Sequence, residues 1–481
     1  MINKILSHNK VIYPAIKQVN LLPNEISLSI HNLPWFSYLK SPMNNDSSDY
    51  SIIGLSPAIV IKSISNNLEI KYYNKSFSEQ GNIFNLLKKI LNSFIIHELP
   101  IDIPFFAGGI GYLSYDLVNY IEQIQLPEHN ILNIPESIWI FYDLVYIFCH
   151  QTGEAYLSCI DLTTESSKAS IKKLNEKIKY WENLLIENIS KSINTKIDLK
   201  LTKNIKSNIS KIEYINAVNK IKNHIINGDI YQANFTYQYQ IPFWDSSFNL
   251  FHIISEYHPT PFSAYINLDN FQVLSFSPER FVKCINNNIL VQPMKGTRPR
   301  GKNILEDEKN KLDLLNSPKD NAELVMIVDL LRNDLGKVSN FASINVDKIK
   351  NIETYPSVYQ LTSSISAQLC HDKTLIDLII ALFPSGSITG CPKISAMKII
   401  SSLEKHKRSI FMGNIGYISF HNTLDLNVAI RTIVRKDDML YFQVGSGIIH
   451  DSIPEDEFQE TLHKSNFLFN FIDDKNNLNI N

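Results

Sequence analysis

A single lysine stands out as a candidate for covalent chemistry. The stretch Gln292–Arg300, QPMKGTRPR, sets Lys295 between Pro293 and a Gly-Thr pair, and Pro299 closes the segment. The prolines stiffen the backbone, while Gly296 lets it bend beside the lysine or come close to a ligand. An amine held in this way can act as a nucleophile if burial or a nearby cation lowers its pKa. The plain alternative is a lysine on a surface loop, so the rest of the chain must decide.

Two segments with helical periodicity each offer two carboxylates, three residues apart and therefore on one face. They are Asp320 with Glu323 in Asn316–Val338, and Glu457 with Glu460 in Ser452–Asn466. Taken alone, the first pair is typical of a solvated acidic first turn, and Glu460 is typical of an i,i+4 surface ion pair with Lys464. If the helices face each other, four carboxylates meet, and like charges about 4 Å apart repel by about 4 kcal/mol at an effective dielectric constant of 20. Such a cluster needs a cation, and all-oxygen ligation with some waters kept is what Mg²⁺ prefers.

Three further segments could hold anionic groups of a substrate. Phe383–Lys393, FPSGSITGCPK, is a loop that runs into a helix start, where free backbone N–H groups and the helix dipole favour an anion. Asn427–Val434 is typical of a strand and places Arg431 among apolar neighbours, where an arginine needs a carboxylate or a ligand as partner. Gln443–Ile449, QVGSGII, is typical of a strand whose two glycines allow a bulge or a close approach to a bound molecule. A turn with a helix cap is the ordinary alternative for the loop.

A candidate acid completes the set. Leu274–Phe281, LSFSPERF, places Glu279 at the end of a strand-like run, where an isolated Glu-Arg pair is normally a salt bridge. Together the segments suggest a dianionic small substrate held by a magnesium ion, with Lys295 as the candidate nucleophile. Spacing along the chain does not show that these segments meet, so their convergence is a hypothesis.

Composition limits the class of protein. The chain has 481 residues, 44% hydrophobic and 20% charged, with a net charge of −2, which is an ordinary globular mix with enough apolar residues for a large core. Nothing indicates a nucleic-acid partner, which would usually appear as a strongly basic face. The most apolar runs are too short to span a bilayer, and the start lacks the apolar core of a signal peptide. The five scattered cysteines favour a reducing cytoplasm over disulfides or a zinc site.

The chain is expected to have two regions, residues 1–200 and 201–481. The first reads as mostly β up to residue 165, and is followed by a helix at Ser166–Ile189. A polar, lysine-rich linker is expected at Ser190–Ser210. A second amphipathic helix is expected at Ile212–Asn227.

Several motifs resemble those of the chorismate-utilising enzymes: PMKGT, SPER, KDNAELVMIVDLLRND, FPSGSITGCPK, IRT, GSGII and EFQET–K. This family includes the large subunits of anthranilate synthase and aminodeoxychorismate synthase, and the isochorismate and salicylate synthases. The resemblance is most specific from about residue 210 to 466. It implies an α+β fold in which two large antiparallel sheets pack as a sandwich with helices outside.

Within the family, the lysine of PMKGT resembles the aminodeoxychorismate synthase branch, because anthranilate synthases carry alanine in PIAGT. GDIYQANFT (Gly228–Thr236) likewise resembles GDCYQVNL of that branch. The resemblance implies amination of chorismate to 4-amino-4-deoxychorismate, for 4-aminobenzoate and folate. The implied alternatives are an isochorismate or salicylate synthase, which shares the lysine but uses water, and an anthranilate synthase. A non-catalytic homologue that binds chorismate or a partner is a further alternative.

The resemblance also assigns roles. Lys295 would add to C2 of chorismate, Glu279 would protonate the leaving hydroxyl, and ammonia would then add at C4. The implied Mg²⁺ ligands are Glu323 and Glu460, with Asp320 and Glu457 nearby or bound through water. The implied substrate-binding residues are Gly296, Thr389, Gly390, Arg431, Gly445, Gly447 and Lys464.

The chain departs from the family pattern at two positions. Many members have an active-site histidine where this chain has Gln360, which cannot transfer a proton near neutral pH, so Glu279 is the better acid. Lys40 stands where anthranilate synthases have the glutamate of their feedback motif LLES, which weakens any expectation of tryptophan inhibition. The sequence contains no amidotransferase segment, so ammonia is expected from a separate glutamine amidotransferase subunit.

Overall fold

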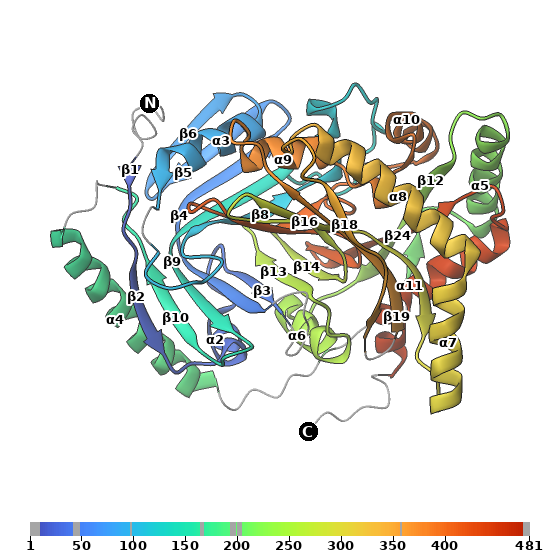
Figure 1. Cartoon of the computed structure of the whole chain (residues 1–481). Coiled ribbons are helices and arrows are strands. Elements are labelled where there is room, and N and C mark those ends of the chain that lie inside the picture. The colour runs from blue at the N-terminus through green and yellow to red at the C-terminus, as the bar shows by residue number, and fades with distance from the viewer. Residues whose placement is uncertain are drawn as a thin grey trace.

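The computed structural model describes residues 10–41, 49–96, 99–163, 168–192, 199, 204–355 and 358–474. Two antiparallel sheets pack face to face, and helices surround them (Figure 1). The sheets share two long strands, β4 (Tyr50–Ile64) and β9 (Ser137–Cys149), whose pairing slips around Gly54–Ile59. Because these two strands bend from one sheet into the other, both halves of the chain contribute to both layers. The expected sandwich is confirmed.

The strands of each sheet follow a simple order from one neighbour to the next. One sheet holds β6 (Lys75–Gln80), β5 (Asn67–Tyr72), β4, β9, β8 (Gly108–Leu113), β21 (Asn414–Ser419), β22 (Leu424–Val428), β15 (Arg280–Ile285), β16 (Asn288–Gln292), β19 (Val358–Gln368) and β18 (Asn345–Thr354), with β17 (Met294–Pro299) continuing beside β19. The other holds β2 (Ala15–Val19), β10 (Ala155–Cys159), β9, β4, β3 (Ser37–Lys40), β13 (Phe262–Asn267), β14 (Phe271–Ser277), β23 (Thr432–Lys436), β24 (Met439–Ile448) and β12 (Gln232–Pro242), with β11 (Lys206–Ser207) and β20 (Gly390–Cys391) on β12. A small parallel pair, β1 (Lys10–Val11) with β7 (Phe94–Ile95), lies apart.

Alternating side chains divide the interior into two cores. On β14, Phe271 and Val273 point into the core between the two sheets, while Leu274 and Phe276 point to the opposite face. This alternation is what the two-residue period of a strand requires. Since both faces of β14 are covered, its sequence reads as a nearly continuous apolar run.

Helices cover the outer faces of the sheets. Their bounds are α2 (Pro23–Ile30), α3 (Ile83–Ser93), α4 (Lys168–Ser192), α5 (Lys211–Ile226), α6 (Ser247–Tyr257), α7 (Ile304–Asn316), α8 (Pro318–Gly336), α9 (Leu375–Leu382), α10 (Lys393–Leu403) and α11 (Pro454–Asp474). Helices α7 and α8 lie on one flank, beside β17 and β19 (Figure 1). No helix among the described residues is long and apolar enough to cross a bilayer.

The predicted helices are confirmed, with small shifts at their ends. The helix expected at Asn316–Val338 is α8, which begins at Pro318 because Ser317 caps it: its hydroxyl accepts a hydrogen bond from the backbone N–H of Asp320. The helices expected at Ser166–Ile189 and Ile212–Asn227 are α4 and α5. The predicted linker at residues 190–210 is described only in part; there α4 extends to Ser192 and β11 occupies Lys206–Ser207.

The strand predicted at Asn427–Val434 is wrong as one element. β22 ends at Val428 and β23 begins at Thr432, and Arg431 lies between them with a φ of 49°. This left-handed conformation interrupts pairing and turns the arginine out of the sheet. None of the residues around Arg431 is typical of a turn, which is why the sequence predicted one continuous strand.

Of the two glycines of β24, Gly445 serves the sheet. The strand pairs with β12 over its whole length without a slip in register, so the bulge allowed by the sequence is absent from it. A Cβ placed on Gly445 would lie 2.4 Å from the carbonyl oxygen of Phe235. Glycine here permits a close approach of two backbones.

One buried arginine joins segments from distant parts of the chain. Arg408 is 2% exposed and pairs with Glu404 at 2.8 Å. Its guanidinium also donates to the carbonyl oxygens of Asn234 on β12 and Ile388 in the loop after α9. A buried cation with this many acceptors fixes their relative positions.

We expect Arg408→Met to lower the free energy of unfolding by about 3–5 kcal/mol, because it leaves the Glu404 carboxylate buried without its cation. Urea denaturation followed by circular dichroism measures the change. The matched control is Lys405→Met, whose partner Glu213 is on the surface, and which we expect to cost less than about 1 kcal/mol. An equal effect of the two substitutions would contradict the role of Arg408.

Candidate active site

A bulge in β17 directs Lys295 away from the regular ladder. The pairing of β17 with β19 slips between Lys295 and Thr297, and Gly296 has a φ of 72°. A Cβ on Gly296 would lie 2.8 Å from the Asp320 carboxylate, so only glycine fits beneath α8 at this point. The Lys295 side chain is 12% exposed, its Nζ lies 3.9 Å from Glu323 Oε2, and it donates to the carbonyl oxygen of Ser387 at 3.2 Å. The lysine is therefore held inside the protein, and the surface-loop alternative is wrong.

Glu279 lies between β14 and β15, where the chain leaves one sheet for the other. Its side chain is buried, and the hydroxyl of Ser387 donates to Glu279 Oε1 at 2.6 Å. Burial raises the pKa of Glu279 to about 7, although the bond from Ser387 and the charge of Lys295 oppose the shift. A carboxyl group with this pKa can hold a proton near neutral pH and release it.

Ser387 is a site residue that the sequence did not single out. It belongs to the loop FPSGSITGCPK, and it contacts Lys295 through its carbonyl oxygen and Glu279 through its hydroxyl. The loop was expected to present amides to an anion. That stays a prediction; the contacts that the loop makes toward this cluster hold the two candidate catalytic groups. A serine six residues before a helix start carries no local signal for such a role.

The two helices with paired carboxylates do meet. Lys319 on α8 lies 3.8 Å from Glu457 on α11, and neighbouring charges of Glu323 and Glu460 influence each other. Each of the four carboxylates also has one cationic partner. The pairs are Asp320 with Arg298 at 3.1 Å, Glu323 with Lys295 at 3.9 Å, Glu457 with Lys319 at 3.8 Å, and Glu460 with Lys464 at 2.6 Å.

These pairs push the pKa values of the carboxyl groups in different directions. Burial raises the pKa of Glu323, with the negative charges of Asp320 and Glu460 adding to the shift against Lys295 and Lys319. For Glu460, burial also acts to raise the pKa, but Lys464, Lys319 and Lys295 outweigh it and the pKa is lowered. Glu460 therefore stays ionised.

The donor set suits a hard divalent cation. Glu457 is 4% exposed, and its Oε2 has no hydrogen-bond partner among the described residues. A buried, unpartnered carboxylate oxygen beside Glu323 and Glu460 can serve as a metal ligand. No group of three or more His, Cys, Asp or Glu side chains encloses a metal site in the described ranges. Mg²⁺ does not need such a cage, because it keeps several waters and uses one or two protein carboxylates.

The residues predicted to bind the substrate differ in their surroundings. Gly447 adjoins the cluster, since a Cβ on it would lie 3.8 Å from Lys295 Nζ, and Lys464 donates to the carbonyl oxygen of Gly445. Thr389 is fully buried and its hydroxyl donates within its own loop. A Cβ on Gly390 would lie 2.2 Å from the Gln232 carbonyl oxygen, so this glycine serves strand pairing.

The guanidinium of Arg431 is available to bind a ligand. Within the described ranges its side chain forms no hydrogen bond or ion pair. Its electrostatic neighbours are His258 and Tyr355, and burial lowers its pKa. A half-buried cation without a counter-charge favours an anionic ligand.

Two buried amides near the lysine also lack partners. Gln232 on β12 is 1% exposed, and Gln360 on β19 is 4% exposed; the Oε1 atom of each accepts no hydrogen bond from the described residues. A Cβ on Gly447 would lie 2.6 Å from Gln232 Nε2, which places this amide beside Lys295. The sequence motif GDIYQANFT contains Gln232, but nothing in the motif singled it out.

Comparison with known proteins identifies this arrangement. A family model described as chorismate binding enzyme matches residues 39–470. The chain belongs to the chorismate-binding enzyme family. It is 32% identical over 440 residues to aminodeoxychorismate synthase component 1 of Escherichia coli (strain K12), covering 91% of this chain and 93% of that protein.

Family members named as anthranilate synthases are equally similar. The chain is 33% identical over 431 residues to anthranilate synthase component 1 of Acetivibrio thermocellus, covering 88% of this chain and 87% of that protein. The crystal structure of anthranilate synthase component I from Streptococcus pneumoniae TIGR4 matches with a TM-score of 0.76 and 27% identity, over 89% and 93% of the two chains. The predicted family and fold are confirmed, and the chain is a chorismate-utilising enzyme. The relatives do not separate the two products.

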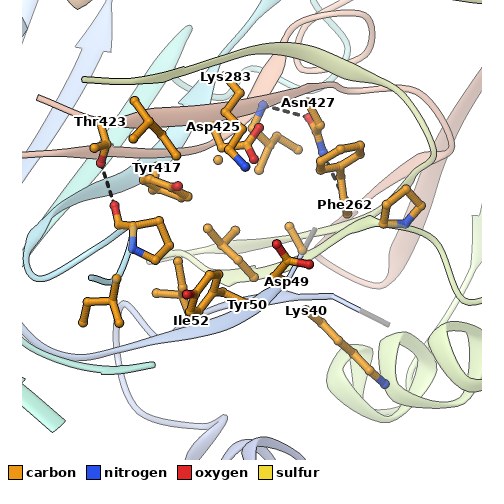
Figure 2. A pocket seen from close by; sticks show the side chains of 18 of the residues that line it. Lys40, Asp49, Tyr50, Ile52, Phe262, Lys283, Tyr417, Thr423, Asp425 and Asn427 are labelled. Atoms are coloured by element: carbon orange, nitrogen blue, oxygen red, sulfur yellow. Dashed lines mark hydrogen bonds between the residues drawn. The ribbon is translucent and has the colours of Figure 1, made fainter. Parts of the chain in front are cut away.

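A cavity of about 330 Å³ lies elsewhere in this chorismate-binding enzyme, and none of the predicted site residues lines it. Figure 2 shows Tyr417 and Asp425 on one wall and Tyr50 and Ile52 on the other. Lys40, at the position of the feedback motif, points away from its centre and pairs with Glu256. This cavity is separate from the Lys295 cluster.

We expect Glu279→Gln to be more stable than the wild type at pH 8 by roughly 2–3 kcal/mol. The folded-state pKa of about 7 lies above the ordinary value of 4.5, so the stability that this carboxyl contributes is complete below pH 4.5 and is lost as the pH rises through 7. Glutamine stays neutral and avoids that loss.

Thermal unfolding at pH 5 and pH 8 measures the effect, and the two proteins should converge at pH 5. Glu306→Gln, on the exposed first turn of α7, is the control and should leave the pH dependence unchanged. A difference that does not depend on pH would contradict the raised pKa of Glu279.

Proposed function

We propose that this chorismate-utilising enzyme converts chorismate and ammonia to 4-amino-4-deoxychorismate. The observation that carries the proposal is the held amine of Lys295, which shares Ser387 with the carboxyl group of Glu279. A nucleophile and a proton donor on two sides of one residue suit a reaction in which a hydroxyl group must leave.

The reaction then runs in two allylic displacements. The neutral amine of Lys295 forms a bond to C2 of chorismate, both conjugated ring double bonds shift, and the C4 hydroxyl leaves as water with the proton of Glu279. The nitrogen of Lys295 loses a proton on attack, and this proton restores Glu279. Ammonia next forms a bond at C4, the double bonds shift back, and the bond from Lys295 to C2 breaks. The new ammonium group loses a proton, which the departing nitrogen of Lys295 takes up to become a neutral amine again. The net change is chorismate plus ammonia to the amino product plus water.

The remaining residues would bind and orient the substrate. The two carboxylates of chorismate would be held by Arg431, Lys464 and backbone amides near Gly447, since cations and free N–H groups bind carboxylates best. Glu323 and Glu460, with Glu457 and Asp320 close by, would hold Mg²⁺. When bound, the metal would supply two positive charges to a substrate carboxylate. Ammonia would come from a separate glutamine amidotransferase subunit.

Anthranilate synthesis is the second candidate, because relatives named as anthranilate synthases match equally well. Lys295 favours the first candidate, since the anthranilate synthases carry alanine in the corresponding motif. An isochorismate or salicylate product would require water in place of ammonia.

Incubation of the purified chain with chorismate, Mg²⁺ and ammonium tests the proposal. We expect an ammonium-dependent product that keeps the enolpyruvyl group, identified by mass spectrometry and by conversion to 4-aminobenzoate with an added lyase. An ammonium-independent isochorismate product, or anthranilate with release of pyruvate, would overturn it.

Replacement of the nucleophile gives the second test. We expect Lys295→Ala to reduce kcat by a factor on the order of 10³ or more, because the two displacements lose their nucleophile. Lys337→Ala, at the far end of α8, is the control for the loss of a lysine near this helix. Retained activity in Lys295→Ala, with folding unchanged by circular dichroism, would rule out the covalent route.

A further inference from the structure

The carboxylate cluster is already balanced in charge without a metal ion. Four carboxylates face four cations in the pairs given above. A divalent cation that joins this cluster adds two positive charges, which must be offset by a dianionic ligand or by the withdrawal of a resident cation. The resident cation that neutralises the carboxylates in the absence of substrate therefore sets the affinity of the cluster for a metal ion.

Three of the four cations have another task. Lys295 and Lys464 are assigned to the substrate under the proposed function. Arg298 also pairs with Asp313 on α7 at 2.6 Å, so it ties α7 and α8 to β17. Lys319 differs from these, since its one ion pair in the described part of the chain is with Glu457, and its side chain forms no hydrogen bond there.

Lys319 lies where the two helices meet. It is in the first turn of α8, half exposed, and its Nζ reaches across to the buried Glu457 on α11. Its charge also acts on Glu323 and Glu460. Glu457 Oε1 already accepts a hydrogen bond from Ser452 at 2.6 Å, whereas Oε2 has no partner among the described residues. A metal ion and Lys319 can therefore bind Glu457 through different oxygens, but they compete for the same negative charge.

We infer that Lys319 is the resident counter-cation of the carboxylate cluster, and that it weakens binding of a divalent cation until a dianionic substrate restores the balance. The inference rests on the metal site of the proposed function. Two unit charges a few ångströms apart interact strongly at a partly buried site and less so in high salt. Lys319 thus acts through Glu457 as a positioning residue, and it links occupancy of the metal site to the presence of the substrate.

The test measures Mn²⁺ binding to the substrate-free full chain by electron paramagnetic resonance, with Mn²⁺ as the probe for Mg²⁺. We expect Lys319→Met to bind Mn²⁺ about tenfold more tightly than the wild type, with a larger gain at low salt. Lys319→Arg keeps the charge and should restore the wild-type affinity. Lys337→Met, on the same helix but paired with Asp334, should leave it unchanged.

A second readout separates this role from a purely structural one. Lys319→Met should lower the melting temperature in metal-free buffer, because Glu457 loses its partner, and Mn²⁺ should restore it by more than in the wild type. Glu457→Gln should weaken Mn²⁺ binding and so locate the ion in this cluster. If the wild type binds Mn²⁺ in the cluster and Lys319→Met binds it with the same affinity, the inference about Lys319 is wrong, while the metal site of the proposed function stands. If neither the wild type nor any variant binds Mn²⁺ in the cluster, the metal assignment of the proposed function fails with it.

Discussion

The contacts of Ser387 set the geometry on which the site depends. Its carbonyl oxygen and hydroxyl hold Lys295 on β17 and Glu279 between β14 and β15. The loop that carries Ser387 is held in turn by Arg408, which binds the carbonyl oxygen of Ile388. A serine bound on both sides cannot move without moving the amine or the acid. The interactions that stabilise the loop therefore also align the amine of Lys295 with the carboxyl group of Glu279.

The cost of burying charge explains the layout around this serine. Acids and amines that stand alone in an interior lose several kcal/mol of hydration, so they need partners. Here each carboxylate of the two helices faces a cation, and Arg298 holds Asp320 over the bulge at Gly296. The bulge and the ion pair support each other, since a side chain at Gly296 would collide with Asp320. Pairing of charges thus keeps α8 at the distance that lets Glu323 face Lys295.

Sequence reasoning succeeded where the signal was local. The helical periodicity of Asn316–Val338 predicted α8 to within two residues at each end, while the sandwich came only from the resemblance to a family. Contacts between distant residues left no such signal: Ser387 is 92 positions from Lys295 and 108 from Glu279. The turn at Arg431 was missed because its left-handed conformation is imposed by the surrounding strands and not by a turn residue. The four carboxylates were found by spacing, and so was the i,i+4 pair of Glu460 with Lys464. The cationic partners of the other three carboxylates come from distant or unmatched positions and were not found.

The different surroundings of Glu279 and Glu460 give these two glutamates different roles. Glu279 is buried, and burial outweighs the help of Ser387 and Lys295, so its pKa rises to about 7. Glu460 lies beside Lys464, and its pKa falls. Environments that push the pKa values of like groups apart assign them to different tasks. A carboxyl group near pH 7 can donate a proton and recover it, whereas a permanently ionised one can only attract a cation. The same side chain thus serves proton transfer in one place and charge in the other, because burial outweighs the nearby cation at Glu279, whereas the nearby lysines outweigh burial at Glu460.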